Sequence, residues 1–381
     1  MAKKWDYDVP EVELWKEVYR VLKPGGHLLS FAGSRTYHRM AVNIEDAGFE
    51  IRDMLGWLYG SGFPKSHNIG KAVDKLEGNK REVIGTENID IGMQGGSMHS
   101  GRSTKIVQRD KTKGNSEWEG WGTALKPAHE PIVMARKPFK GTVAENVLTH
   151  GTGGINIDEC RVGTELIKTH GKGTMKGNTP IVPQNPDYEG KTHTGRFPAN
   201  IIHDGSEEVL EIFPETNPSK RHYRTSPKNK NVCYGVYNEN NTIRGHNDEG
   251  TAARFFYCAK ASKAERNMGL DDFKEEFKAA ADFRPNHKEK ALEGESGNPF
   301  GRWGKIKNNH PTVKPIKLME YLVRLVTPKE GIVLEPFAGS GTTLIACKQQ
   351  GFNYIGIERE QEYCDIAEAR LKGVQIQGTL F

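Results

Sequence analysis

A glycine-rich turn between an apolar segment and a helical segment constrains the fold of this chain more than any other feature. The apolar residues 332–334 precede the loop from Phe337 to Gly341, and the pattern of a helix follows over 343–350. A second short apolar run at 354–357 and another helical pattern at 362–371 come next. This alternation predicts strands and helices in right-handed βαβ topology, with the strands parallel.

The loop lies where open α/β sheets bind ligands, outside the carboxyl ends of the strands. Glu358 stands 19 residues after Gly339, an offset at which an acidic residue commonly holds the hydroxyls of a ribose. Gly341 is followed by two threonines and not by the lysine of a phosphate-binding loop. The pattern favours a zwitterionic, ribose-bearing cofactor. A plain tight turn and a solvated carboxylate are the simpler alternatives.

The N-terminal 65 residues have the pattern of a packed α/β core. Helical spacing of apolar residues over 12–22 is followed by an apolar strand at 27–32, a helix at 37–47 and a strand at 49–59. Another strand is predicted at 130–136. The helix at 316–326 has apolar residues on two sides, which predicts burial on both.

Composition changes between these core segments. Residues 66–125 are rich in Gly, Asn, Ser and Lys and predict an insertion made mostly of loops. Residues 141–307 are polar, with short apolar islands at 200–202 and 254–258. A polar stretch of that length does not fit a single loop in a compact domain, so we expect an accessory region of irregular α+β structure.

Charge and cysteine content set further bounds. The net charge of +5 and the pI near 8.7 are compatible with a nucleic-acid partner and equally with an ordinary basic surface. No apolar run is long enough to span a membrane, and no apolar leader begins the sequence. The five cysteines never form a CxxC pair, which predicts free thiols in a reducing cytoplasm and no metal site.

Two motifs together carry a family resemblance. Residues Asn308 to Pro315 (NNHPTVKP) lead a helix into Leu334 to Thr343 (LEPFAGSGTT). The pair resembles the signature of S-adenosylmethionine-dependent DNA N6-adenine and N4-cytosine methyltransferases of the permuted type, in which the cofactor motif follows the catalytic half. Asp is the usual residue where Glu335 stands. The resemblance implies a Rossmann-like α/β methyltransferase sheet.

The resemblance also implies a cofactor site. The loop from Phe337 to Gly341 would hold the methionine moiety, the segment from His310 to Lys314 would line the same pocket, and Glu358 would bind the ribose. The residues expected to bind S-adenosylmethionine are His310, Thr312, Lys314, Phe337, Gly339, Ser340, Gly341, Thr342 and Glu358.

The N-terminal segment resembles the catalytic half of the family after its active-site loop. The match covers Val12 to Phe31 and then Trp57 to Ser66. Phe63 stands between Gly62 and Pro64 and is expected to stack on an extruded base, with a core position as the alternative. For Trp57 a core position is the expectation.

The residues that would accept the base amine are not found. The family supplies them with a tetrapeptide of Asp, Asn or Ser, two prolines and an aromatic residue, and no such tetrapeptide occurs in the sequence. The nearest string, Asn185 to Tyr188, has one proline and predicts a polar turn. We therefore expect the sheet to lack its central catalytic strand beside 332–334. A truncated enzyme, half of a split enzyme and a decayed remnant are the open explanations, of which the first is favoured.

The resemblance assigns a role to each segment. Residues 1–65 would form the catalytic half, 66–125 a loop-rich insertion, 126–140 a return strand, 141–307 the target-recognition region and 308–381 the cofactor-binding half. Double-stranded DNA is the expected partner, with a homodimer or a complementing chain as a further one. Lysine and arginine neutralise phosphates, so the candidate DNA contacts are Lys65, Arg221, Arg224 and Lys228, although a solvated basic loop explains them equally well.

The expected activity is site-specific methylation of a base amine, with adenine N6 favoured over cytosine N4, in a bacterial or phage restriction-modification setting. We expect little activity from this chain alone. A non-catalytic DNA-binding remnant that still binds the cofactor is one rival. A methyltransferase that acts on RNA or protein is another.

Overall fold

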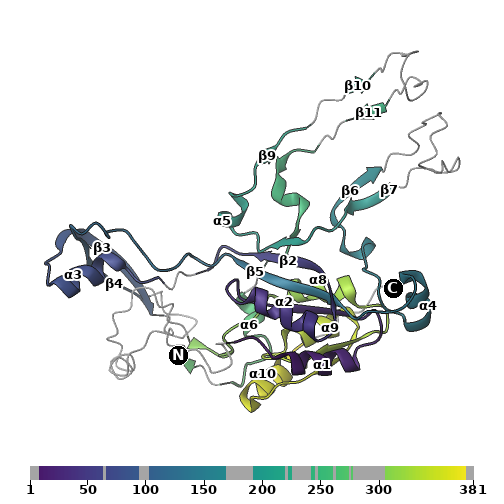
Figure 1. Cartoon of the computed structure of the whole chain (residues 1–381). Helices are drawn as coiled ribbons and strands as arrows, with labels where there is room; N and C mark the ends of the chain where they lie inside the picture. The colour runs from purple at the N-terminus through teal and green to yellow at the C-terminus, as the bar shows by residue number, and fades with distance from the viewer. Residues whose placement is uncertain are drawn as a thin grey trace.

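The computed structural model describes residues 8–62, 66–93, 103–168, 192–218, 222–224, 242–244, 248–260, 263–273, 276–277 and 305–374. In the described part, the N-terminal and C-terminal segments lie together in one α/β body (Figure 1). The segments between them leave this body as hairpins that project in two directions (Figure 1). The body therefore combines described residues from the N-terminal and the C-terminal parts of the sequence.

The main sheet has five strands in the order β1-β5-β2-β8-β13. Strand β5 is antiparallel to both of its neighbours, whereas β8 is parallel to β2 and to β13. The strands predicted at 27–32, 49–59 and 130–136 are confirmed. The bounds are β1 His27–Phe31, β2 Glu50–Leu58, β5 His129–Arg136, β8 Ile201–His203 and β13 Tyr257–Cys258.

Helices cover both faces of this sheet. On one face, α1 (Val12–Val21) and α2 (Tyr37–Asp46) bury Trp15 and Ile44 among strand residues such as Val133. On the other face lies α8 (Ile316–Val326), and eight of its residues are buried, as its two apolar sides predict. Its leucines pack against strand residues that include Trp57, whose expected core position is confirmed.

The C-terminal half forms the predicted strand–helix–strand–helix unit. Strands β16 (Ile332–Glu335) and β17 (Asn353–Gly356) are parallel, and α9 (Thr342–Gln350) connects them before α10 (Gln361–Lys372). Within the described residues β16 pairs with β17 alone, and β1 pairs with β5 alone. The strands of the α/β core that the structure describes therefore lie in two sheets.

The prediction that residues 66–125 are mostly loops is wrong for the part that the structure describes. This part forms α3 (Ile69–Glu77) and a long antiparallel hairpin of β3 (Glu82–Met93) and β4 (Ser103–Lys113). A two-stranded ribbon has no buried face of its own, so its sequence shows little of the alternation that marks a strand in a packed sheet. This unit projects from one side of the body (Figure 1).

Residues 141–307 contribute directly to the core. Their apolar islands at 200–202 and 254–258 contain β8 and β13, which extend the main sheet beyond β2. The hairpins β6–β7 and β10–β11 project away from the body (Figure 1). The other elements of these residues are α4 Val143–His150, η2 Asp158–Cys160, β6 Val162–Lys168, β7 Thr192–Arg196, α5 Glu207–Leu210, β9 Glu215–Thr216, β10 His222–Arg224, β11 Thr242–Arg244, β12 Gly250–Thr251, η3 Ala252–Phe255, α6 Lys263–Arg266, β14 Glu276–Phe277 and β15 Lys305–Ile306.

No helix in the described ranges is both long and apolar enough to cross a membrane.

Candidate functional site

The loop from Phe337 to Gly341 connects the end of β16 to the start of α9. Gly339 and Gly341 have φ angles of +53° and +76°, in the left-handed region that glycine adopts without strain. A Cβ on Gly339 would lie 2.7 Å from Nε2 of His310, and a Cβ on Gly341 would lie 2.9 Å from Cβ of Ala367. Both the backbone conformation and the close packing on two sides therefore require glycine here.

Glu358 lies beside this loop, as its spacing from Gly339 predicts. Its Oε2 accepts a hydrogen bond from the Gly339 N–H at 2.8 Å, and its Oε1 accepts from the N–H groups of Arg359 and Glu360. An ionised carboxylate has about four acceptor positions. Glu358 thus fixes the loop and keeps the capacity to accept one more donor, such as a sugar hydroxyl.

Glu335, the last residue of β16, fixes the start of the loop. Its carboxyl accepts the Phe337 N–H at 3.1 Å and the Thr343 hydroxyl at 2.7 Å. Burial raises the pKa of Glu335, and the nearby Glu358 carboxylate raises it further, although the two hydrogen bonds act in the opposite direction. Glu335 therefore holds the loop at both of its ends, at Phe337 and at Thr343.

The segment from Asn308 to Lys314 forms the facing wall. The ring of His310 packs edge-on against Tyr363, with ring centroids 4.6 Å apart. Its Nδ1 accepts the N–H of Thr312 at 3.3 Å, and its Nε2 faces Gly339. The two motifs of the sequence thus meet at one place.

The remaining predicted residues lie at the edge of this site. Lys314 pairs with Glu130 at the start of β5, and its ammonium lies 4.7 Å from the centre of the Phe31 ring at the end of β1. Phe337 is 52% exposed and contacts Trp15 of α1 edge-on, with centroids 6.5 Å apart. The site therefore lies between the two sheets of the core.

Ser340 and Thr342 point away from the open side of the loop. Both are buried, and both hydroxyls accept hydrogen bonds from Arg370 of α10. Sequence reasoning missed Arg370. The signal was present, because residue 370 follows the buried residues Tyr363, Ile366 and Ala367 at helical spacing and so occupies the buried side of α10.

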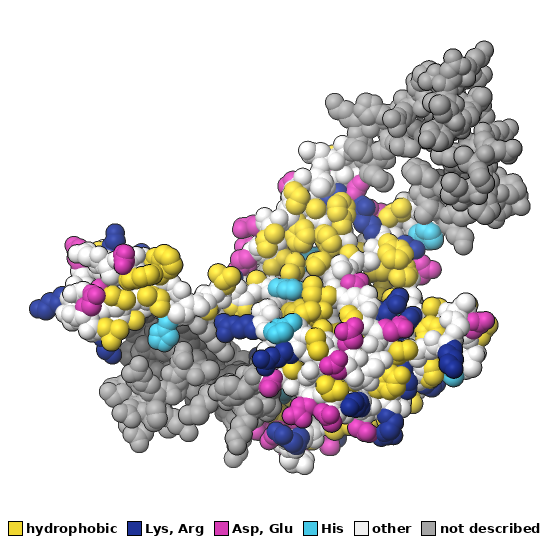
Figure 2. Space-filling view, in the orientation of Figure 1, with side chains coloured by type: hydrophobic (Ala, Val, Ile, Leu, Met, Phe, Trp, Pro, Cys, Tyr) yellow, Lys and Arg dark blue, Asp and Glu magenta, His cyan; other side chains and the backbone are white. Residues whose placement is uncertain are grey.

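The candidate base-stacking residue Phe63 and the candidate DNA contacts Lys65, Arg221 and Lys228 lie outside the described residues. Arg224 lies in β10, of which the backbone alone is described. The string from Asn185 to Tyr188 also falls outside. Figure 2 shows basic and acidic side chains interspersed over the visible face of the body, in keeping with the modest net charge.

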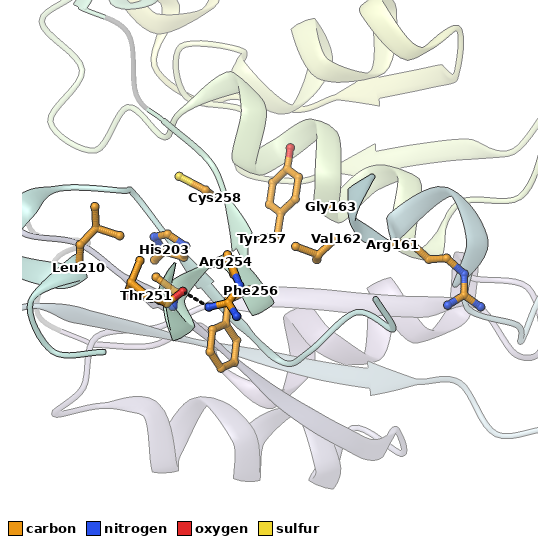
Figure 3. A pocket seen from close by; sticks show the side chains of 11 residues that line it. Arg161, Val162, Gly163, His203, Leu210, Thr251, Arg254, Phe256, Tyr257 and Cys258 are labelled. Carbon is orange, nitrogen blue, oxygen red and sulfur yellow. Dashed lines mark hydrogen bonds between the residues drawn. The ribbon is translucent and has the colours of Figure 1, made fainter. Parts of the chain in front are cut away.

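A cavity of about 470 Å³ lies elsewhere, lined by residues between Arg161 and Cys258, and none of the predicted cofactor residues lines it (Figure 3). Its wall includes Tyr257 of β13, which stacks on Tyr321 of α8 at 4.0 Å, and His203 of β8. Burial lowers the pKa of His203. We assign the functional site to the loop and not to this cavity, because a turn that requires glycine lies there against His310 and is hydrogen-bonded to the carboxylate of Glu358.

Comparison with known proteins gives the following matches. A family model described as DNA methylase matches residues 6–369. The type II methyltransferase M.HindIII of Haemophilus influenzae is 23% identical over 364 residues, which cover 94% of this chain and 68% of that protein. The putative methylase YubD of Escherichia coli K12 is 45% identical over 67 residues, which cover 18% of this chain and 30% of that protein.

Solved structures match over most of the chain at low similarity. A structure described as the cytosine-N4-specific PvuII DNA methyltransferase matches 94% of this chain and 70% of its own, with 12% identity and a TM-score of 0.34. A structure described as the complex of M1.HpyAVI with SAM matches 94% of this chain and 81% of its own, with 16% identity and a TM-score of 0.35.

Proposed function

The chain belongs to the DNA methylase family, and from that premise we propose that it transfers a methyl group from S-adenosylmethionine to an exocyclic amine of a base in double-stranded DNA. Adenine N6 is favoured over cytosine N4. The observation that carries the proposal is the meeting of two motifs, since the Gly339 loop lies against His310 and is hydrogen-bonded to Glu358.

The residues of the loop fit such a cofactor. S-adenosylmethionine supplies, when bound, a methyl group on a positively charged sulfonium. Glu358 lies against the loop and can accept a ribose hydroxyl. The exposed ring of Phe337 offers an apolar surface at the mouth of the site. We propose that the other predicted cofactor residues also line the S-adenosylmethionine site. Ser340 and Thr342 would act indirectly, because their buried hydroxyls hold the loop through Arg370.

The target base must leave the DNA stack to reach this site. We propose that residues 141–307 choose the sequence, that Lys65, Arg221, Arg224 and Lys228 contact the DNA, and that Phe63 stacks on the extruded base. The segment divisions at 65, 125, 140 and 307 belong to the same proposal. A homodimer or a complementing chain is proposed as a further partner, because β1 and β16 are each paired on one side within the described residues.

Two measurements test the proposed function. Titration calorimetry with S-adenosylmethionine is expected to give one site per chain in the wild type and none in Gly339→Trp, which fills the space against His310. Labelled cofactor and mixed-sequence duplex DNA, followed by mass spectrometry of the nucleosides, would identify N6-methyladenine or N4-methylcytosine. Equal labelling of RNA or protein in competition would contradict the assignment to DNA.

The amount of methyl transfer by residues 1–381 alone is a separate expectation. We expect little, because no tetrapeptide of the active-loop type occurs in this sequence. Robust methylation of duplex DNA by the purified chain, abolished by Gly339→Trp, would contradict this expectation and leave the proposed function intact.

A further inference from the structure

Two arginines connect both walls of the candidate cofactor site to one short segment of chain, residues 263–273. This segment follows β13, the last strand that the recognition region gives to the main sheet, and it begins with α6. Arg370 reaches the segment from α10, which packs behind the loop of Phe337 to Gly341. Arg266 lies in the segment itself.

Arg370 is fully buried and has only uncharged hydrogen-bond partners among the described residues. Its Nη1 donates to the carbonyl oxygen of Ser340 at 2.5 Å and to the hydroxyls of Ser340 and Thr342 at 3.1 and 3.2 Å. Its Nη2 donates to the carbonyl oxygen of Glu265 at 3.1 Å. One guanidinium thus joins the back of the cofactor loop to the segment 263–273.

A buried cation that is not hydrogen-bonded to a carboxylate is costly for the fold, and the charge of Glu265 offsets the burial of Arg370 only in part. Burial lowers the pKa of Arg370 to about 10, so the guanidinium is still charged at neutral pH. An apolar side chain of similar volume would avoid this cost. We therefore attribute the presence of an arginine here to its ability to bind four acceptors at once, which come from two segments far apart in the sequence.

The packing around Arg370 leaves little room for the loop to move. A Cβ on Gly341 would lie 2.9 Å from Cβ of Ala367 on one side of α10. A Cβ on Gly269 would lie 2.6 Å from the carbonyl oxygen of Ala369 on the other side. Helix α10 is thus in close contact with the cofactor loop and with the segment 263–273 at neighbouring positions.

The facing wall is held by the same segment. Arg266 donates from Nε to the carbonyl oxygen of Asn308 at 3.3 Å and from Nη2 to that of His310 at 2.8 Å. The buried Asn308 side chain donates back to the carbonyl oxygen of Arg266 at 3.0 Å. The carboxyl of Glu265 accepts the N–H of Ile316 at the start of α8. Both walls are therefore positioned by residues 265 and 266.

We propose that Arg370 and Arg266 are positioning residues that hold the two walls of the cofactor site in the binding conformation by fixing both to residues 263–273. The inference rests on the proposed function in so far as the ligand is S-adenosylmethionine. The apparent dissociation constant of a ligand is the intrinsic one divided by the fraction of protein in the binding conformation, so it rises as that fraction falls. Loss of an arginine that orders the loop is expected to weaken binding about tenfold or more on this basis.

The test compares Arg370→Met with a matched control, Arg324→Met. Arg324 lies in α8 and also bonds to uncharged acceptors, the side-chain oxygen of Gln350 and the carbonyl of Glu159, but it does not contact the cofactor loop. Calorimetry with S-adenosylmethionine should give a dissociation constant at least about tenfold higher for Arg370→Met and unchanged for Arg324→Met. Equal affinity in a folded Arg370→Met protein would overturn the proposal.

Hydrogen exchange of residues 337–343 gives a second measurement that requires no ligand. Exchange should be faster in Arg370→Met than in the wild type and in Arg324→Met, whereas equal exchange would overturn the proposal. If the wild type binds no S-adenosylmethionine, the proposed function fails and this measurement still decides the inference. If Arg370→Met does not fold, Arg370→Lys and Arg266→Gln take its place. Wild-type affinity and wild-type exchange in both would again overturn the proposal.

Discussion

At the scale of single residues, the buried carboxyl of Glu335 makes the cofactor loop sensitive to pH. Its pKa is raised in the folded chain, mainly by burial. A group whose folded pKa is raised binds its proton more tightly in the folded state, so the folded state is favoured at low pH. That stability is lost as the pH rises from the ordinary value of a glutamate through the folded pKa.

We predict that Glu335→Gln stabilises the chain above neutral pH. The amide can still accept the Phe337 N–H and can donate to the Thr343 hydroxyl, and it carries no charge to bury. The unfolding midpoint at pH 8 should rise by about 2 °C or more, and the difference should shrink toward pH 4.5. The exposed Glu368 provides the control variant Glu368→Gln, and a midpoint lowered equally at both pH values would contradict the prediction.

His27 of β1 should make the folded state less stable at low pH, the opposite of the effect of Glu335. Burial lowers its pKa from 6.5 to about 4, with further repulsion from Arg136 and Arg52. The folded state therefore resists protonation, and stability present above pH 6.5 is lost as the pH falls toward 4, by roughly 3 kcal/mol at most. Urea unfolding at pH 7 and pH 4.5 should show this loss in the wild type and a smaller loss in His27→Gln. The exposed His150→Gln should behave as the wild type, and a wild-type pH dependence in His27→Gln would refute the assignment.

At the scale of elements, α3 and the β3–β4 hairpin form a unit around a buried ion network. Arg81 bonds to the carboxylates of Asp74 and Glu119 and to the carbonyl of Thr112 in β4. The Asp74 side chain is almost fully buried, at 3% exposure. Arg81 lowers the pKa of Glu119. The network therefore joins α3 to β4 and to the segment of Glu119.

We predict that Arg81→Met loosens this unit and leaves the α/β body intact. The change leaves the carboxylate of Asp74 buried without its cation, which is unfavourable. Amide exchange in α3 should become about tenfold faster or more, since local opening is set by local stability, while exchange in α8 stays unchanged. Lys75→Met on the exposed side of α3 is the control. Unchanged exchange in α3 of Arg81→Met would show that the network does not hold the unit together.

The sequence predicts the elements of the body well and the projecting ones poorly, for a physical reason. Helix α8 and strand β5 are buried in the body, so their apolar residues follow their geometry. The β3–β4 ribbon has no such constraint. In the site, spacing predicts Glu358 correctly beside Gly339, because both follow parallel strands at one edge. Arg370 was not predicted, because it is charged and so does not add to the apolar pattern of α10, although its spacing places it on the buried side.

At the scale of the whole molecule, DNA affinity is expected to depend strongly on salt. Each phosphate that a basic residue neutralises contributes about 0.9 to the slope of log affinity against log salt. If Arg221 and Arg224 contact phosphates, changing both to Ala should weaken binding and flatten the slope by up to about 1.8. Lys16 and Arg20, exposed on α1, provide the matched double variant. An unchanged slope would dismiss the two arginines as phosphate contacts.

The anchoring of the recognition region in the main sheet has a consequence for how new sequence specificity can arise. The Gly56 N–H of β2 bonds to the carbonyl of Asn200, and the Asp204 N–H bonds back to the carbonyl of Leu58. A cassette exchange of residues 141–307 between relatives would therefore remove β8 and β13 from the recipient and expose the edge of β2. Recombination breakpoints placed after β9 and before β12 would keep β8 and β13, leave the β9–β12 pair intact and exchange the hairpin β10–β11. If residues 141–307 select the DNA sequence as proposed, specificity can change in the projecting hairpin while β8 and β13 stay with the core.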